Sequence, residues 1–135
     1  MIVIDGSMLV GFINSEQGGD RLLDLLADED CTIGAPTLVE ARARCAINLP
    51  ARSSRWLESF IDTPSVGVIP FSRQMADVAS NAFIRYGRAS GHPAKLNFGD
   101  CMAYAVSVVT RAPLLFKGRD FARTDVMAHP ASLRI

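Results

Sequence analysis

Short apolar runs along the chain alternate with longer segments in which apolar residues recur at helical spacing. The apolar runs cover residues 1–5, 31–35, 66–69 and 113–116. Runs of this length without a polar alternation are typical of strands that are buried on both faces, as in a parallel sheet. The pattern therefore predicts four short strands, and residues 133–135 are a candidate for a short fifth one.

The segments between these strands carry apolar residues at intervals of three and four, which predicts helices. Pro36 suits the first turn of one helix, where its missing N–H has no intrahelical partner anyway, and Ser72 is a plausible cap for another. The predicted helices cover residues 7–13, 22–28, 36–49, 56–61, 72–90 and 99–110, with Ser7 as a possible cap of the first.

Strands that alternate with helices predict right-handed βαβ crossovers. The length of 135 residues suits a single domain with a real hydrophobic core. We therefore expect one α/β domain over residues 1–135, with a mostly parallel central sheet of four to five strands flanked by helices.

Composition and charge narrow the class of protein. Lys+Arg and Asp+Glu each number 14, so the formal net charge is zero. This balance argues against a protein that holds nucleic acid by bulk attraction alone, although a nuclease can combine a basic rim with an acidic centre. No uncharged apolar run reaches ~18 residues, and the first residues lack a basic segment. We expect no membrane span or signal peptide, and the cytoplasm as the compartment.

The cysteines and histidines do not form a metal-binding pattern. Cys31, Cys45 and Cys101 are far apart, odd in number and in apolar settings. We therefore expect neither a zinc site nor a disulfide framework, and we assign the cysteines to the core. His92 and His129 each precede a proline and are expected in solvated loops.

Four acidic residues fall where predicted strands or helices would aim them at one point. Asp5 closes the first strand, Glu40 lies in the helix after the second, Asp100 opens the last helix, and Asp120 follows the fourth strand. Ligands of parallel α/β sheets bind at the carboxyl ends of the strands. Because clustered carboxylates repel one another, a fold that gathers them is expected to hold a divalent cation. The pattern indicates a metal-dependent reaction on phosphate.

Each acid also has an ordinary explanation. Asp5 would be a polar end to a strand, and Asp120 a turn residue. Glu40 with Arg44 would be a helix-surface pair worth ~0.2–0.5 kcal/mol. Asp100 would gain ~0.3–1 kcal/mol from the helix macrodipole. None of these explanations accounts for all four acids in this order.

Four segments resemble the motifs of PIN-domain nucleases. They are Met1-Ile2-Val3-Ile4-Asp5-Gly6-Ser7, Thr37-Leu38-Val39-Glu40-Ala41, Asn97-Phe98-Gly99-Asp100-Cys101-Met102-Ala103-Tyr104-Ala105 and Leu114-Leu115-Phe116-Lys117-Gly118-Arg119-Asp120-Phe121. The third is the most specific. Order and spacing agree over essentially the whole chain, and the length is that of the VapC toxins of bacterial toxin–antitoxin pairs.

The resemblance implies a Mg²⁺- or Mn²⁺-dependent ribonuclease that is usually dimeric and is held inactive by a cognate VapB antitoxin. It also implies that the metal site is made by the acidic residues of the four motifs: Asp5, Glu40, Asp100 and Asp120. The chain departs from the family pattern at Gly6, where a hydroxyl residue is common, and at Met8, where a small residue is common. Gly6 is expected to loosen the first helical turn, and Met8 to narrow the packing behind it.

We assign different roles to the four acids. Mg²⁺ binds one or two carboxylates directly and keeps several waters, and we assign Asp5 and Asp100 as the direct ligands. Glu40 and Asp120 would either orient the attacking water or complete a second metal position. This chemistry does not require a 2′-hydroxyl, so only the resemblance points to RNA.

Basic and polar residues near the acids are candidates for substrate contacts. Lys117 and Arg119 flank the turn that carries Asp120 and are the first candidates for binding phosphates. The resemblance adds Ser7, the small polar residue beside the first acid, and Asn97, a polar position in the third motif.

Two other functions remain open at this point. An α/β phosphoacceptor domain would phosphorylate one acid with the help of Lys117, although its acceptor usually follows a middle strand and residues 66–69 end without an acid. A non-catalytic PIN-like binding module would keep the fold without turnover.

Overall fold

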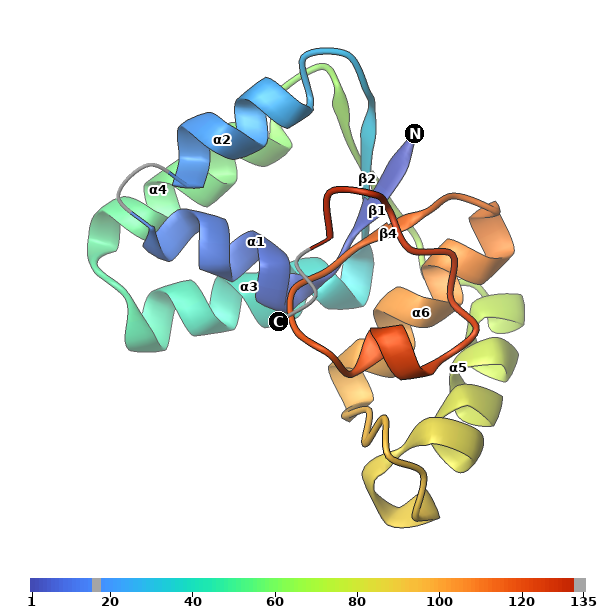
Figure 1. Ribbon diagram of the computed structural model, residues 1–135. Helices are drawn as coiled ribbons and strands as arrows, with labels where there is room; N and C mark the ends of the chain where they lie inside the picture. The colour runs from blue at the N-terminus through green and yellow to red at the C-terminus, as the bar shows by residue number, and fades with distance from the viewer. Residues whose placement is uncertain (16–17, 133–135) are drawn as a thin grey trace.

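The computed structural model describes residues 1–15 and 18–132 and has a sheet between two layers of helices (Figure 1). Strands β1 (Ile2–Ile4), β2 (Cys31–Gly34), β3 (Val66–Ile69) and β4 (Leu114–Leu115) are all parallel, in the order β3-β2-β1-β4. The predicted α/β class and parallel sheet are confirmed. The candidate fifth strand at 133–135 lies outside the described residues.

Helices α1 to α4 lie on one side of the sheet, and α5 and α6 lie on the other (Figure 1). Each crossover between parallel strands places its helices over a sheet face, which buries β1, β2 and β4, whereas the edge strand β3 is partly exposed. The helices are α1 (Gly6–Asn14), α2 (Gly18–Leu25), α3 (Ala35–Asn48), α4 (Ala51–Ile61), α5 (Arg73–Tyr86) and α6 (Phe98–Thr110), with 3₁₀ turns η1 (Arg88–Ser90) and η2 (Phe121–Arg123).

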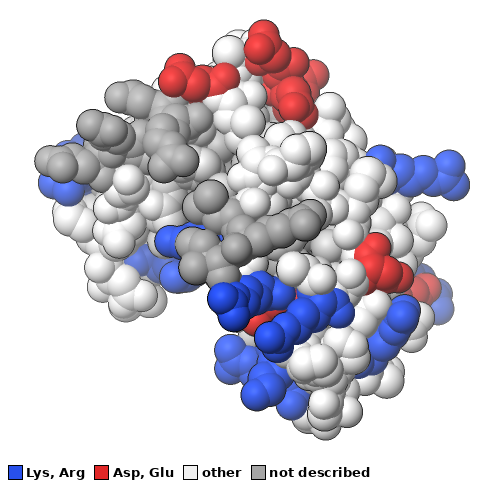
Figure 2. All heavy atoms as spheres, viewed as in Figure 1, with Lys and Arg blue, Asp and Glu red and all other residues white. Residues whose placement is uncertain are grey.

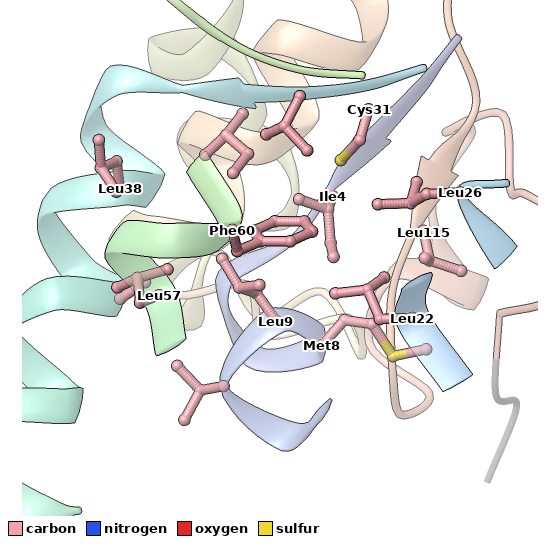
Figure 3. Close-up of a cluster of buried hydrophobic side chains, with 14 of the residues drawn as sticks. Ile4, Met8, Leu9, Leu22, Leu26, Cys31, Leu38, Leu57, Phe60 and Leu115 are labelled. Carbon is pink, nitrogen blue, oxygen red and sulfur yellow. The ribbon is translucent and has the colours of Figure 1, made fainter. Parts of the chain in front are cut away.

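Strand β1 takes part in both hydrophobic cores. Its side chains alternate between the two faces, so Ile2 and Ile4 enter one core and Val3 enters the other. Figure 3 shows the first core, in which Leu9 of α1 and Phe60 of α4 lie around Ile4. The full burial of β1 fixes the position of the residue that follows it, which is Asp5.

The start of α1 differs from the prediction. Ser7 was expected to cap a helix over residues 7–13, but the helix begins at Gly6 and its N-cap is Asp5. The Asp5 carboxylate accepts a hydrogen bond from the Ser7 backbone N–H at 3.1 Å. An ionised carboxylate is a strong cap and interacts well with the positive end of the helix.

The end of α5 also differs. Ser72 caps the helix as predicted, through a 3.1 Å bond from the Met75 N–H. However, the helix ends at Tyr86 and not near residue 90. At Gly87 the backbone turns so closely against the Phe83 carbonyl that a Cβ there would clash with it. Glycine therefore permits the turn that ends the helix.

The cysteines and histidines have different outcomes. Cys31, Cys45 and Cys101 are buried free thiols, as predicted. The expectation of a solvated His129 is wrong, since its ring is buried and its Nε2 lies 3.1 Å from Glu29 Oε1. His92 is only half-buried. Across the described ranges, no helix is both long enough and apolar enough to cross a bilayer.

Candidate active site

Asp5 lies at the carboxyl end of the central strand β1 and is held from two sides. Its backbone N–H donates to the Leu115 carbonyl at 3.0 Å, which ties it to β4. Its side chain is only 2% exposed and accepts hydrogen bonds from the Ser7 N–H and the Ser7 hydroxyl. The fold therefore places one carboxylate at a fixed point inside the protein.

Burial makes the ionisation of Asp5 unfavourable. The pKa of Asp5 is raised from 3.8 to about 7, mainly by loss of solvation; the charges of Asp100 and Glu40 contribute to this rise, and the hydrogen bonds from Ser7 oppose it. The charges of Asp5, Glu40 and Asp100 therefore repel one another, although Asp5 follows β1, Glu40 lies in α3 and Asp100 lies in α6. A cation bound between these carboxylates would relieve the repulsion.

Asp100 is positioned by the N-terminus of α6. Its backbone N–H donates to Asn97 Oδ1 at 2.7 Å, and its Oδ2 accepts from the Asn97 N–H at 2.9 Å, which forms a reciprocal capping box. Burial raises the pKa of Asp100 to about 6; the Asn97 hydrogen bond opposes this shift, and the charges of Asp120 and Glu40 add to it.

Glu40 extends from α3 toward the other two acids. Its carboxylate lies against the backbone of Gly6 and Gly99, which directly adjoin Asp5 and Asp100 in the chain. The ordinary explanation as a surface pair is not supported, because no ion pair joins Glu40 to Arg44 in the described residues.

Asp120 is the most exposed of the four acids and follows β4. The turn before it passes through Gly118, whose φ of +96° lies in the left-handed region that favours glycine. Its charge is among those that raise the pKa of Asp100. The structure therefore brings together the four acids that the sequence analysis singled out.

The chemistry of the donor set fits a hard divalent cation. The four residues offer only carboxylate oxygens, which Mg²⁺ and Mn²⁺ prefer. Among residues 1–15 and 18–132, however, no three Asp, Glu, His or Cys side chains are arranged so that they could hold a metal ion as they stand. The fit therefore rests on the chemistry of the donor set, four carboxylates whose charges act on one another.

Basic side chains surround part of this site. Figure 2 shows Lys and Arg gathered beside an acidic side chain, in the region that the segment after β4 crosses in Figure 1. The stem of Lys117 passes over α1, because its Cδ lies 3.8 Å from where a Cβ on Gly11 would be. Arg119 is exposed, and Arg123 donates to the Pro93 carbonyl at 3.0 Å.

Arg88 is a site residue that the sequence analysis missed. It follows the end of α5, and its backbone N–H donates to the Leu96 carbonyl at 3.2 Å, next to the Asn97 cap. Its positive charge lowers the pKa of Asp100. No motif or spacing marks Arg88, since its approach depends on a pairing between residues 87 and 96.

Ser7 and Asn97 both have structural roles. The Ser7 hydroxyl donates to Asp5, and the Asn97 side chain caps α6. Asn97 is exposed and Ser7 half-buried, so their contact with a substrate stays a prediction.

The comparisons with known proteins match most of the chain. The family model of the PIN domain matches residues 2–127. The chain is 35% identical over 130 residues to the VapC ribonuclease Mb0625 of Mycobacterium bovis, covering 93% of this chain and 95% of that protein. It is 32% identical to the VapC ribonuclease R02377 of Rhizobium meliloti, covering 93% and 99% of the two chains.

Solved structures share the fold at lower identity. VapBC2 from Rickettsia felis, solved bound to a DNA fragment from its promoter, superposes with a TM-score of 0.73 at 15% identity, covering 95% of this chain and 96% of that one. FitAcB from Neisseria gonorrhoeae superposes with a TM-score of 0.65 at 20% identity, covering 95% and 96%.

The buried Asp5 predicts how stability depends on pH. Its pKa is higher in the folded protein than in the unfolded chain, so the folded state binds more protons between about pH 4 and 7. The free energy of unfolding of metal-free protein should therefore fall as the pH rises through this window. Asp5→Asn cannot ionise and should be more stable than the wild type by ~2–4 kcal/mol above pH 7, with little difference near pH 4.

Urea unfolding in the presence of a chelator at both pH values measures this difference. Asp77→Asn, an exposed acid on α5, is the matched control and should show no such pH-dependent gain. A destabilised Asp5→Asn protein at both pH values would contradict the expected penalty on the Asp5 charge.

Proposed function

Because the chain belongs to the PIN-domain family, we propose that it is a Mg²⁺- or Mn²⁺-dependent endoribonuclease of the VapC type, acting as the toxin of a toxin–antitoxin pair. The observation that carries this proposal is that four carboxylates gather from the buried Asp5 outward, close enough for their charges to act on Asp5 and Asp100. The relatives named VapC ribonucleases support RNA as the substrate. Burial is the main cause of the raised pKa values of Asp5 and Asp100, and repulsion between the acids adds to it; a cation would relieve this repulsion.

In the proposed site, Asp5 and Asp100 hold the cation, and the Ser7 hydroxyl and the α6 cap keep their carboxylates in place. When bound, the cation polarises a phosphoryl oxygen, lowers the pKa of water and neutralises charge on the leaving oxygen. Glu40 and Asp120 complete the acidic site, where they would orient the attacking water or add a second metal position. The capping box uses Oδ2 of Asp100, which leaves Oδ1 for the cation.

Family membership leaves the phosphoacceptor alternative without support, because that alternative depended on a different α/β family. The non-catalytic binding module is the alternative that an experiment must separate from the nuclease. Both have the same fold, and they differ only in turnover.

Asp100→Asn is the variant that separates them. An asparagine keeps an oxygen that accepts the Asn97 N–H, so α6 stays capped, but it removes the charge from the site. We expect RNA cleavage with Mn²⁺ to fall by about 100-fold or more, and growth arrest on expression to disappear. RNA end sequencing after induced expression measures both cleavage and its position.

Circular dichroism would verify that Asp100→Asn is folded, and Asp77→Asn should cleave like the wild type. Undiminished growth arrest in Asp100→Asn would contradict the proposal. A folded wild-type protein that cuts no RNA with either metal would favour the binding module.

Lys117, Arg119 and Arg88 are proposed to bind phosphates of the RNA. All three are exposed; Arg88 lowers the pKa of Asp100, and Lys117 and Arg119 flank the turn before Asp120, where their charges would offset the repulsion between the acids and the substrate backbone. Each contact to single-stranded RNA contributes about 0.7 to the slope of log affinity against log salt.

Replacing each of these residues with glutamine, in the cleavage-deficient Asp100→Asn background, should weaken RNA binding several-fold. The salt slope should fall by about 0.7 for each variant, which fluorescence anisotropy measures. Arg111→Gln is the control, because Arg111 caps the opposite end of α6 from Asp100. An equal loss in Arg111→Gln would show that only overall charge matters.

A VapB-type antitoxin and a second copy of the chain are the proposed protein partners. Structural neighbours include a toxin–antitoxin complex from Klebsiella pneumoniae, which superposes with a TM-score of 0.68. The chain also exposes large apolar side chains that a partner would cover, including Val39 and Ile47 on α3, Ile84 on α5 and Phe98 on α6.

Affinity purification of the tagged chain from its native host, followed by mass spectrometry and light scattering, tests these partners. We expect a small companion protein in stoichiometric amount, and a toxin alone at twice 14.6 kDa. A monomer of 14.6 kDa with no companion would contradict both partners.

A further inference from the structure

The carboxylate of Glu40 occupies a slot between two glycines from different helices. A Cβ on Gly6, the first residue of α1, would lie 2.7 Å from Glu40 Oε1. A Cβ on Gly99, in the first turn of α6, would clash still more closely with Oε2. Both distances are shorter than real Cβ contacts, so each carboxylate oxygen uses space that only a glycine leaves.

Backbone conformation does not explain these two glycines. Neither has a positive φ, in contrast to Gly91 and Gly118. Gly6 and Gly99 both lie in the first turn of their helix, where the helix itself does not call for glycine. The close approach of Glu40 therefore supplies a reason for glycine at these two positions.

The slot also determines where the Glu40 charge lies. Glu40 is on α3, and its long side chain must reach the ends of α1 and α6 to approach Asp5 and Asp100. Because Gly6 and Gly99 are the chain neighbours of these two acids, a carboxylate seated against both glycines lies beside both acids. A methyl group at either position would displace the flexible end of Glu40 and leave the helices in place.

We infer that Gly99 and Gly6 are positioning residues, which hold the Glu40 carboxylate in the metal site by leaving the slot that it fills. This inference rests on the proposed metal-dependent function and adds two residues to it that touch neither substrate nor cation. It differs from a packing role of Gly99 between α3 and α6, because a packing role would not depend on the Glu40 carboxylate.

The test is a double-mutant cycle on Mn²⁺ affinity, measured by isothermal titration calorimetry with the purified full chain. Gly99→Ala should stay folded and lose affinity by about tenfold or more, as expected when a supporting residue of a metal site is lost. Glu40→Ala should lose at least as much. The Gly99→Ala/Glu40→Ala double variant should bind like Glu40→Ala alone, because the slot then has no carboxylate to position.

Two further variants sharpen the cycle. Glu40→Asp in the Gly99→Ala background shortens the side chain by one methylene and should recover part of the lost affinity. Gly67→Ala is the matched control, because a Cβ on Gly67 of β3 would contact nothing within 4 Å. It should bind Mn²⁺ like the wild type.

Wild-type Mn²⁺ affinity in Gly99→Ala, or unchanged affinity in Glu40→Ala, would overturn the inference. So would a double variant that binds Mn²⁺ more weakly than Glu40→Ala by the same factor that Gly99→Ala loses alone. If Gly99→Ala does not fold, the same cycle with Gly6→Ala decides the question. The cycle reports metal binding and not turnover. A wild-type protein that binds Mn²⁺ but cuts no RNA would therefore refute the proposed function while the cycle still tests the slot.

Discussion

The site depends on the burial of one carboxylate, that of Asp5, which is almost inaccessible to water. Strand β1 lies between β2 and β4 and is buried on both faces, so the residue that follows it has little freedom to turn outward. The hydrogen bonds from Ser7 partly compensate the lost hydration but leave the pKa of Asp5 raised to about 7. The same carboxylate caps α1, which links the acid to the helix that carries Leu9 into the core.

The other three acids lie progressively nearer the protein surface. Asp100 is fixed by its capping box, Glu40 by the space between two glycines, and Asp120 by the turn after β4. Exposure increases from Asp5, through Glu40 and Asp100, to Asp120. The inner acid is therefore held rigidly and the outer one faces the solvent, from which a nucleic acid and its attacking water would approach.

The sequence predicted the strands and the gathering of the four acids, because both depend on local patterns; the role of the acids as metal ligands stays a prediction. A strand that is buried on both faces appears as an unbroken apolar run, and the carboxyl ends of parallel strands meet at one edge. Helix ends were predicted less well. Asp5 replaced Ser7 as the cap of α1, because a cap depends on backbone geometry that apolar spacing does not encode.

Contacts between distant segments were beyond prediction. His129 is buried against Glu29, which is one hundred residues away in the chain. Arg88 comes near Asp100 through the bridge between Gly87 and Leu96, and no residue type in that loop signals the pairing. Such contacts form when helices, strands and loops pack against one another, so only the three-dimensional structure could reveal them.

Gly6 shows how a departure from a family pattern acquires a physical meaning. A glycine after the first acid was expected to loosen the helical turn, but Asp5 caps that turn and Gly6 is buried as its first residue. The Ser7 hydroxyl provides the hydrogen bond to Asp5. The volume that a side chain at position 6 would occupy is instead filled by the Glu40 carboxylate. In this chain, the missing side chain thus brings an acid from α3 closer to Asp5.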